Sequence, residues 1–206
     1  MKQLLLDIQP PARPTFENFI AGRNAEALHS LDLALKGNES ARFIYLWGEP
    51  GSGKSHLAVA YQYLNNQAIV VDDVQLLDDA AQIKLFNTYN ELRNNTDFGK
   101  TLVVTGNAAP MQMNLRDDLA TRLAWGLTYQ LQPLSDEEKA LALMSHADAR
   151  GMRLPTEVIT YCLHYLQRDL PTLISTINAL DEWSLITKKP VTVPMLRQLL
   201  QLPIHQ

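Results

Sequence analysis

The chain has 206 residues, of which 46% are hydrophobic and 19% charged, and this length suits one ordinary domain or a core domain with a small appendage. Its net charge of −4 argues against a protein that holds duplex DNA by neutralising phosphates, although net charge does not exclude a local basic patch. We find no apolar run long enough to span a membrane and no signal-peptide pattern, so we expect a cytoplasmic protein without a membrane partner.

Residues 1–14 are predicted to form an arm outside the core. Residues 3–8 combine apolar and polar side chains, and the prolines that follow stiffen the chain and disfavour a helix. An extended peptide of this kind can dock on a partner, with aliphatic side chains in pockets and a glutamine that hydrogen-bonds. The side chains in those roles would be Gln3, Leu4, Leu6 and Ile8. The alternative is a strand that adds to the core sheet.

Residues 15–132 are predicted to form an α/β core. Compact apolar runs indicate buried strands, and apolar residues at helical spacing indicate the helices between them. Because strands alternate with helices, we expect a parallel sheet, here of four strands. The strands are predicted at 43–47, 68–71, 101–105 and 127–131, and the helices at 26–35, 55–65, 79–94 and 116–123.

Residues 133–206 are predicted to form a small all-α domain, a lid on the core. Ser135 and Glu138 make a capping box at the start of its first helix, and Gly151 closes that helix. Further helices are expected at 156–168, capped by Thr156, at 171–187, and from Pro194 onward.

The most informative segment is residues 48–55, the phosphate loop, which lies between a predicted strand and a predicted helix and matches G-x-x-x-x-G-K-S. Its glycines permit positive φ, so that backbone N–H groups and the helix dipole can face a phosphate. Lys54 would reach the β- and γ-phosphates, and Ser55 would hold Mg²⁺. A plain glycine-rich turn is the alternative. We assign to ADP or ATP the residues Gly48, Gly51, Ser52, Gly53, Lys54, Ser55 and His56.

Two acids, Asp72 and Asp73, end the predicted strand 68–71. In nucleoside triphosphatases one such acid holds Mg²⁺ through water, and a second polarises the attacking water. We therefore assign both Asp72 and Asp73 to catalysis, and Asp72 also to Mg²⁺, through water, together with Ser55; a solvated turn is the alternative. Asn107 ends the next strand and could orient the water or touch the γ-phosphate, but Gly-Asn is also a plain turn.

With residues 119–126 added, the chain resembles the AAA+ family, in the branch around the replication initiator DnaA. Segments 15–19 and 22–24 resemble the adenine-binding segment of that branch, 72–75 its Walker B motif, 105–107 its sensor 1, 121–123 its arginine-finger box and 168–170 its sensor 2. The resemblance implies that Arg122 is an arginine finger acting in trans and that Arg168 senses the bound phosphates. The alternative for Arg122 is a helix-surface ion pair with Asp118.

Within that branch the chain is similar to the Hda group, the regulatory inactivators of DnaA. In DnaA a helix-turn-helix domain follows the lid, whereas this sequence stops at Gln206, and a strand-plus-helix module of DnaA is missing before residue 68. Residues 3–8 resemble the peptide with which Hda docks on the DNA polymerase III β sliding clamp. The resemblance implies a nucleotide-bound regulator that reaches DNA only through the clamp and stimulates hydrolysis of DnaA-bound ATP, preventing re-initiation; its own ATPase would be weak at most. Self-association stays open.

Two other functions fit the same motifs. A loader ATPase would use Asp73 and Asn107 to hydrolyse its own ATP during ring assembly. A pure adaptor would bind clamp and DnaA without affecting hydrolysis, and would be indicated by an Arg122 buried in an intramolecular contact.

Overall fold

The computed structural model describes residues 13–94, 100–166 and 169–201. The chain divides into two compact units: the core unit, Pro14–Pro133, and the lid unit, which takes in the residues from Leu134 onward. Among the described helices, none is long and apolar enough to cross a membrane.

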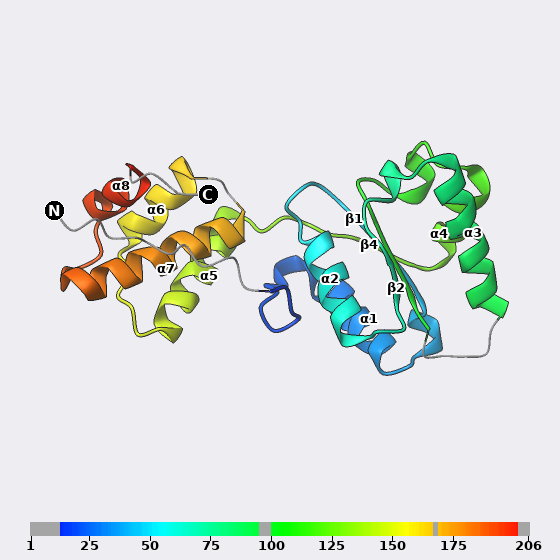
Figure 1. Ribbon diagram of the computed structural model, residues 1–206, viewed down its shortest axis with the longest axis horizontal. Coiled ribbons are helices and arrows are strands. Elements are labelled where there is room, and N and C mark those ends of the chain that lie inside the picture. Colours follow the sequence, from blue (N-terminus) through cyan, green and yellow to red (C-terminus); the bar gives the residue numbers. More distant parts are fainter. Residues whose placement is uncertain (1–12, 95–99, 167–168, 202–206) are drawn as a thin grey trace. The chain divides into compact units, whose positions relative to one another are not determined.

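The core unit contains one parallel sheet of four strands (Figure 1). Strands β1 (Phe43–Trp47), β2 (Ile69–Val71), β3 (Leu102–Gly106) and β4 (Leu127–Gln130) lie in the order β2-β3-β1-β4. Trp47 pairs with Gly106 on one side and with Gln130 on the other, so the carboxyl ends of three strands meet at one edge. The predicted α/β fold with four parallel strands is confirmed.

Helices cover both faces of this sheet, as Figure 1 shows. Helices α1 (Ala25–Leu35) and α2 (Lys54–Leu64) pack on one face, and α3 (Asp79–Asn94) and α4 (Asp117–Trp125) pack on the other. Alternate residues of β1 enter the two hydrophobic clusters because side chains along a strand point to opposite faces. Short 3₁₀ turns complete the unit at Gly22–Asn24, Glu39–Ala41, Val74–Leu76 and Pro110–Gln112.

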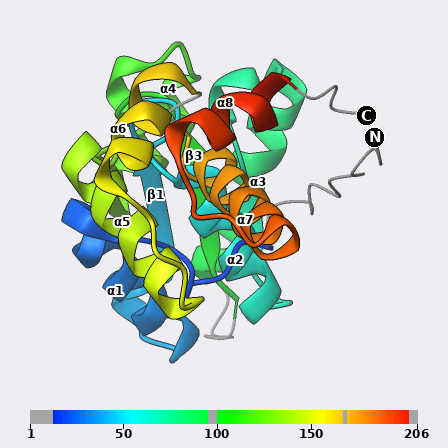
Figure 2. The ribbon, with the colours of Figure 1, turned by 90° about the vertical axis from the view of Figure 1, so that its left-hand side faces the viewer.

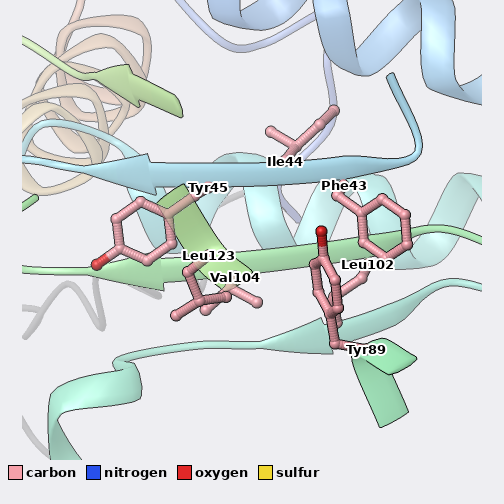
Figure 3. Close-up of a pocket in the computed structure, with 7 residues that line it drawn as sticks. All are labelled: Phe43, Ile44, Tyr45, Tyr89, Leu102, Val104 and Leu123. Carbon is pink, nitrogen blue, oxygen red and sulfur yellow. The ribbon is translucent and has the colours of Figure 1, made fainter. Parts of the chain in front are cut away.

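A small pocket lies on the α3 and α4 side of the sheet (Figure 3). Its walls are apolar apart from the phenols of Tyr45 and Tyr89, and the Tyr45 hydroxyl donates to the Ala108 carbonyl at 2.9 Å. Burial raises the pKa of both phenols, so they stay neutral. The pocket is therefore a packing defect of the core and offers a ligand no charged group.

The amide of Asn24 joins the two ends of the core unit. This side chain is 4% exposed; it donates to the Gln132 carbonyl at 2.9 Å and accepts from the Gln132 N–H at 2.8 Å. Arg23 adds a bond to the Pro133 carbonyl at 3.0 Å. The segment before α1 is thus held against the chain that leaves β4.

The lid unit consists of four described helices (Figure 2): α5 (Asp136–Ala149), α6 (Thr156–Tyr165), α7 (Leu170–Thr187) and α8 (Val193–Gln201). They share a hydrophobic core to which every helix contributes buried residues. The predicted helical lid is confirmed. The capping box before α5 is present, because Ser135 accepts from the Glu138 N–H at 3.2 Å while Glu138 accepts from the Ser135 N–H at 2.7 Å.

Helix α6 differs from its prediction at both ends. Its N-cap is Pro155, in extended backbone, so Thr156 is the first helical residue and does not cap. The helix ends at Tyr165 instead of continuing to residue 168, because Leu166 has left the helical region. Asp169 then caps α7, accepting from the Thr172 N–H at 2.8 Å, and a cap requires non-helical backbone.

Candidate nucleotide site and arginine surface

The phosphate loop adopts a shape that depends on glycine at two positions. Gly48 has φ +147°, and a Cβ there would lie 2.3 Å from the Leu131 carbonyl oxygen. Gly53 has φ +93° as the N-cap of α2, and a Cβ there would lie 2.6 Å from the Phe19 ring. Gly51, at φ +80°, completes the turn. The loop therefore ends at a helix N-terminus, where free N–H groups favour an anion.

Lys54 and Ser52 bring polar groups into this loop. Lys54 is 8% exposed, and its ammonium donates to the carbonyls of Gly48 at 2.8 Å and Glu49 at 2.9 Å. Burial lowers the pKa of Lys54, and the nearby charges of Asp73 and Asp72 raise it. Ser52 Oγ is buried with no hydrogen-bond partner among the described residues. A phosphate oxygen would satisfy that hydroxyl, so the loop fits a nucleotide.

His56 faces the N-terminal segment of the core unit. Its Nε2 lies 2.9 Å from the Thr15 carbonyl, and its ring centroid lies 5.5 Å from that of Phe19. Ser55, one residue earlier, is exposed in the first turn of α2. The structure thus links the phosphate loop, through His56, to the segment whose sequence resembles an adenine-binding element.

Thr105 connects the two acids. Its hydroxyl donates to Asp72 Oδ1 and accepts from the Asp73 N–H at 2.8 Å. Asp73 has φ +53°, and its Oδ1 accepts from Gln75 Nε2 at 2.9 Å. Asn107 is exposed just beyond the end of β3. The ends of β2 and β3 are therefore tied together through a buried hydroxyl to which sequence reasoning had assigned no role.

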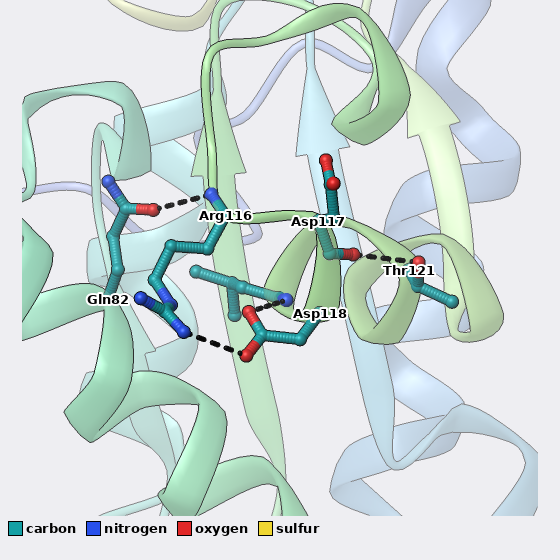
Figure 4. Close-up of polar contacts among 6 residues, drawn as sticks. Gln82, Arg116, Asp117, Asp118 and Thr121 are labelled. Atoms are coloured by element: carbon teal, nitrogen blue, oxygen red, sulfur yellow. Dashed lines mark hydrogen bonds and ion pairs between the residues drawn. The ribbon is translucent and has the colours of Figure 1, made fainter.

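Gln82 fixes the start of α4 against α3 (Figure 4). Its side chain is buried; Oε1 accepts from the Arg116 N–H at 2.9 Å, and Nε2 donates to the Leu77 carbonyl at 3.1 Å. The Arg116 guanidinium lies 3.2 Å from Asp118, and this hydrogen bond lowers the pKa of Asp118. Asp118 also accepts from the Leu119 N–H at 2.8 Å. The helix that carries Arg122 therefore has a defined starting point.

Arg122 lies among aromatic rings. Its guanidinium carbon is 4.5 Å from the ring centroid of Trp125 and 5.9 Å from that of Phe86. In the described ranges, the carboxylate of Asp118 pairs with Arg116 instead, so the alternative ion pair between Asp118 and Arg122 is wrong. Arg122 is half-buried, not enclosed.

The remaining predicted site residues lie outside the described residues: Arg168, Gln3, Leu4, Leu6 and Ile8.

Two family models match adjacent parts of the chain. The model of the bacterial DnaA ATPase domain matches residues 58–130, and the model of the Hda lid domain matches residues 136–200. In these two parts the chain matches an Hda-like, DnaA-related AAA+ protein. The interval between the two matches contains the boundary of the core and lid units, between Pro133 and Leu134.

Solved DnaA structures share the fold of this chain. Domain III of Thermotoga maritima DnaA is 24% identical with a TM-score of 0.69, and the match covers 94% of this chain and 98% of that one. AMPPCP-bound DnaA from Aquifex aeolicus is 19% identical with a TM-score of 0.67, covering 88% and 71%. A DnaA bound to AMPPCP and single-stranded DNA is 20% identical with a TM-score of 0.68, covering 88% and 69%.

Proposed function

We propose that this protein is a nucleotide-bound regulatory inactivator of DnaA, which docks on the sliding clamp, stimulates hydrolysis of DnaA-bound ATP and thereby prevents re-initiation. A DnaA-like AAA+ core joined to an Hda lid supports a DnaA-related replication regulator. The observation that carries the finer proposal is Arg122, a half-buried guanidinium held by aromatic rings at the end of α4.

Arg122 would act on ATP held by DnaA. A guanidinium placed at the γ-phosphate neutralises charge that develops in the transition state, and such fingers contribute on the order of 10³–10⁵ in rate. Its planar fork can donate two hydrogen bonds to phosphate oxygens at once, which a lysine ammonium cannot reproduce.

The protein's own site would bind ADP or ATP as a structural switch. Ser52, Lys54 and the N-terminus of α2 would hold the phosphates, in keeping with the AMPPCP bound to two of the similar DnaA structures. Ser55 and Asp72 would hold Mg²⁺, which neutralises phosphate charge when bound. Arg168, in the lid, would respond to the phosphates and alter the exposure of Arg122.

The clamp would be reached through the arm. Leu4, Leu6 and Ile8 would enter pockets of the clamp while Gln3 hydrogen-bonds, so the protein would meet DNA only through the clamp. Tethering to clamp on DNA raises the effective concentration of Arg122 near DnaA without any new contact.

The decisive experiment measures hydrolysis of ATP prebound to DnaA in the presence of DNA-loaded clamp. We expect the protein to stimulate hydrolysis, Arg122→Ala to abolish stimulation, and Arg116→Ala to retain it, since Arg116 has its own carboxylate. A variant whose residues 3–8 are replaced by alanine should need a higher protein concentration to reach the same stimulation. If the clamp-bound wild-type protein does not stimulate hydrolysis, the inactivator function is ruled out and the adaptor function is favoured.

A loader ATPase is the second candidate, because Thr105 ties Asp72 to Asp73 and both charges reach Lys54. Rapid hydrolysis of the protein's own ATP, lost in Asp73→Asn, would favour it.

A further inference from the structure

Two guanidinium groups lie next to the ring of Trp125. Arg122, on the same helix, lies 4.5 Å from the ring centroid, and Arg93, on α3, lies 5.1 Å from it. Because both are measured from one centroid, the two cations are no more than about 10 Å apart, close to the Debye length of about 8 Å at physiological ionic strength. We call Arg93, Trp125 and Arg122 the tryptophan stack.

One face of α3 forms the base of the tryptophan stack. Phe86, Tyr89 and Arg93 follow one another at spacings of three and four residues, which places them on the same side of the helix. Arg122 also lies over Phe86. Burial raises the pKa of the Tyr89 phenol, while the charges of Arg93 and Arg122 lower it, so both cations act at the same place.

The two cations of the tryptophan stack lack a counter-charge in the described part of the chain. Other arginines pair with acids there: Arg116 with Asp118 at 3.2 Å and Arg150 with Asp181 at 3.0 Å. Within residues 13–94, 100–166 and 169–201, no carboxylate lies at ion-pair distance from Arg93 or Arg122. Two neighbouring cations that share one ring repel each other, and an incoming anion would relieve that repulsion.

Within the described residues, no acceptor takes a hydrogen bond from the guanidinium of Arg93 or Arg122, which lie beside the Trp125 ring. A ring attracts the flat face of the group, whereas the N–H donors point outward in its plane, toward a phosphate or carboxylate. Trp125 is 59% exposed, so the tryptophan stack stands at the surface of the core unit. The ring therefore holds the cations nearby without using their N–H donors.

We propose that Trp125 is a positioning residue for Arg122 and that Arg93 is a second cation of the same surface. The tryptophan stack is then a receptor for the terminal phosphates of a nucleotide held by a second protein molecule. This inference rests on the proposed function: Arg122 neutralises the charge that develops at the γ-phosphate, and Arg93 attracts and retains the polyphosphate. Two guanidiniums fit a triphosphate better than one does.

The kinetic test uses stimulated hydrolysis on DnaA with four variants of the full chain. Trp125→Leu should lower the maximal stimulated rate about tenfold, which corresponds to about 1.4 kcal/mol, and Trp125→Tyr should restore most of it because a ring is present again. Arg93→Gln should raise the concentration for half-maximal stimulation about fivefold and flatten its salt dependence. Arg116→Gln, the matched charge control at the N-cap of α4, should change neither quantity.

Equal unfolding midpoints for these variants would show that a lower rate does not result from a loss of folded protein. A Trp125→Leu protein as active as the wild type, or a Trp125→Tyr protein as weak as Trp125→Leu, overturns the positioning role.

A binding test shows whether the tryptophan stack binds phosphates, even if DnaA proves not to be the partner. Trp47→Phe and Trp183→Phe leave Trp125 as the only tryptophan. With ADP saturating the phosphate loop, tripolyphosphate should change the Trp125 emission saturably, and the effect should vanish when Arg93→Gln and Arg122→Gln are combined but persist with Arg116→Gln. An unchanged emission, or a change that survives loss of both arginines, overturns the receptor whatever the kinetics show. Failure of the wild type to stimulate DnaA overturns the proposed function alone.

Discussion

Among single residues, Thr105 has the most consequential position in the nucleotide site. Its buried hydroxyl is bonded to the side chain of Asp72 and to the backbone of Asp73 at once. The phosphate loop and the two acids could be predicted from local patterns. The role of Thr105 could not, because it depends on the pairing of β3 with β2, which no run of neighbouring residues reports.

We expect Thr105→Val, which keeps the shape of the side chain, to lower the free energy of unfolding by about 1–3 kcal/mol, because two hydrogen bonds of a buried hydroxyl are lost. It should also weaken ATP binding severalfold, since the acids lose their fixed orientation. The matched control is Thr101→Val: this buried hydroxyl bonds to Tyr61 at 2.8 Å, away from the acids. Urea unfolding and titration with a fluorescent nucleotide measure both effects, and equal loss of affinity in the two variants would contradict the assignment.

At the scale of elements, the contact between α3 and α4 determines where the tryptophan stack lies. The strands and helices could be predicted because apolar periodicity marks each of them. The start of α6 was predicted wrongly because threonine is a good capping residue in general, yet here Pro155 already occupies the extended position before the helix. The approach of Arg93 to Trp125 could not be predicted, since it requires the packing of α3 on α4.

We expect Gln82→Met to loosen this contact. Methionine has a similar size but loses both bonds, to the Arg116 N–H and the Leu77 carbonyl, so the free energy of unfolding should fall by about 1–3 kcal/mol. Stimulation of DnaA should fall as well, because α4 carries Arg122. Asn87→Leu, at an exposed position of α3, is the control and should stay within about 0.5 kcal/mol of wild type. A Gln82→Met protein with wild-type stability would show that these bonds add nothing.

At the scale of the whole molecule, the chain has two units with separate hydrophobic cores. Both the α/β core and the all-α lid could be predicted from the sequence. The alternation of strand and helix patterns stops at Pro133, and only helix patterns follow. Separate cores allow separate unfolding, in which case a single transition would not describe the protein.

We expect urea to unfold the two units at different midpoints. A protein with Trp125 as its only tryptophan reports on the core unit, and one with only Trp183 reports on the lid unit. ADP should raise the midpoint of the core unit, since a ligand stabilises the state that binds it. The same chains without ADP are the reference. Coincident midpoints with and without ADP would show that the two units unfold as one.

The bonds between Asn24 and Gln132 also bear on how the protein is made. Residue 24 leaves the ribosome more than a hundred residues before its partner does, so the segment that holds Phe19 against Gly53 lacks these two bonds while most of the core unit is being synthesised. Synthesis of β4 and of the two residues after it must be complete before this segment can be fixed. A nascent chain stalled before Gln132 should therefore expose its N-terminal segment to a protease that the released protein resists.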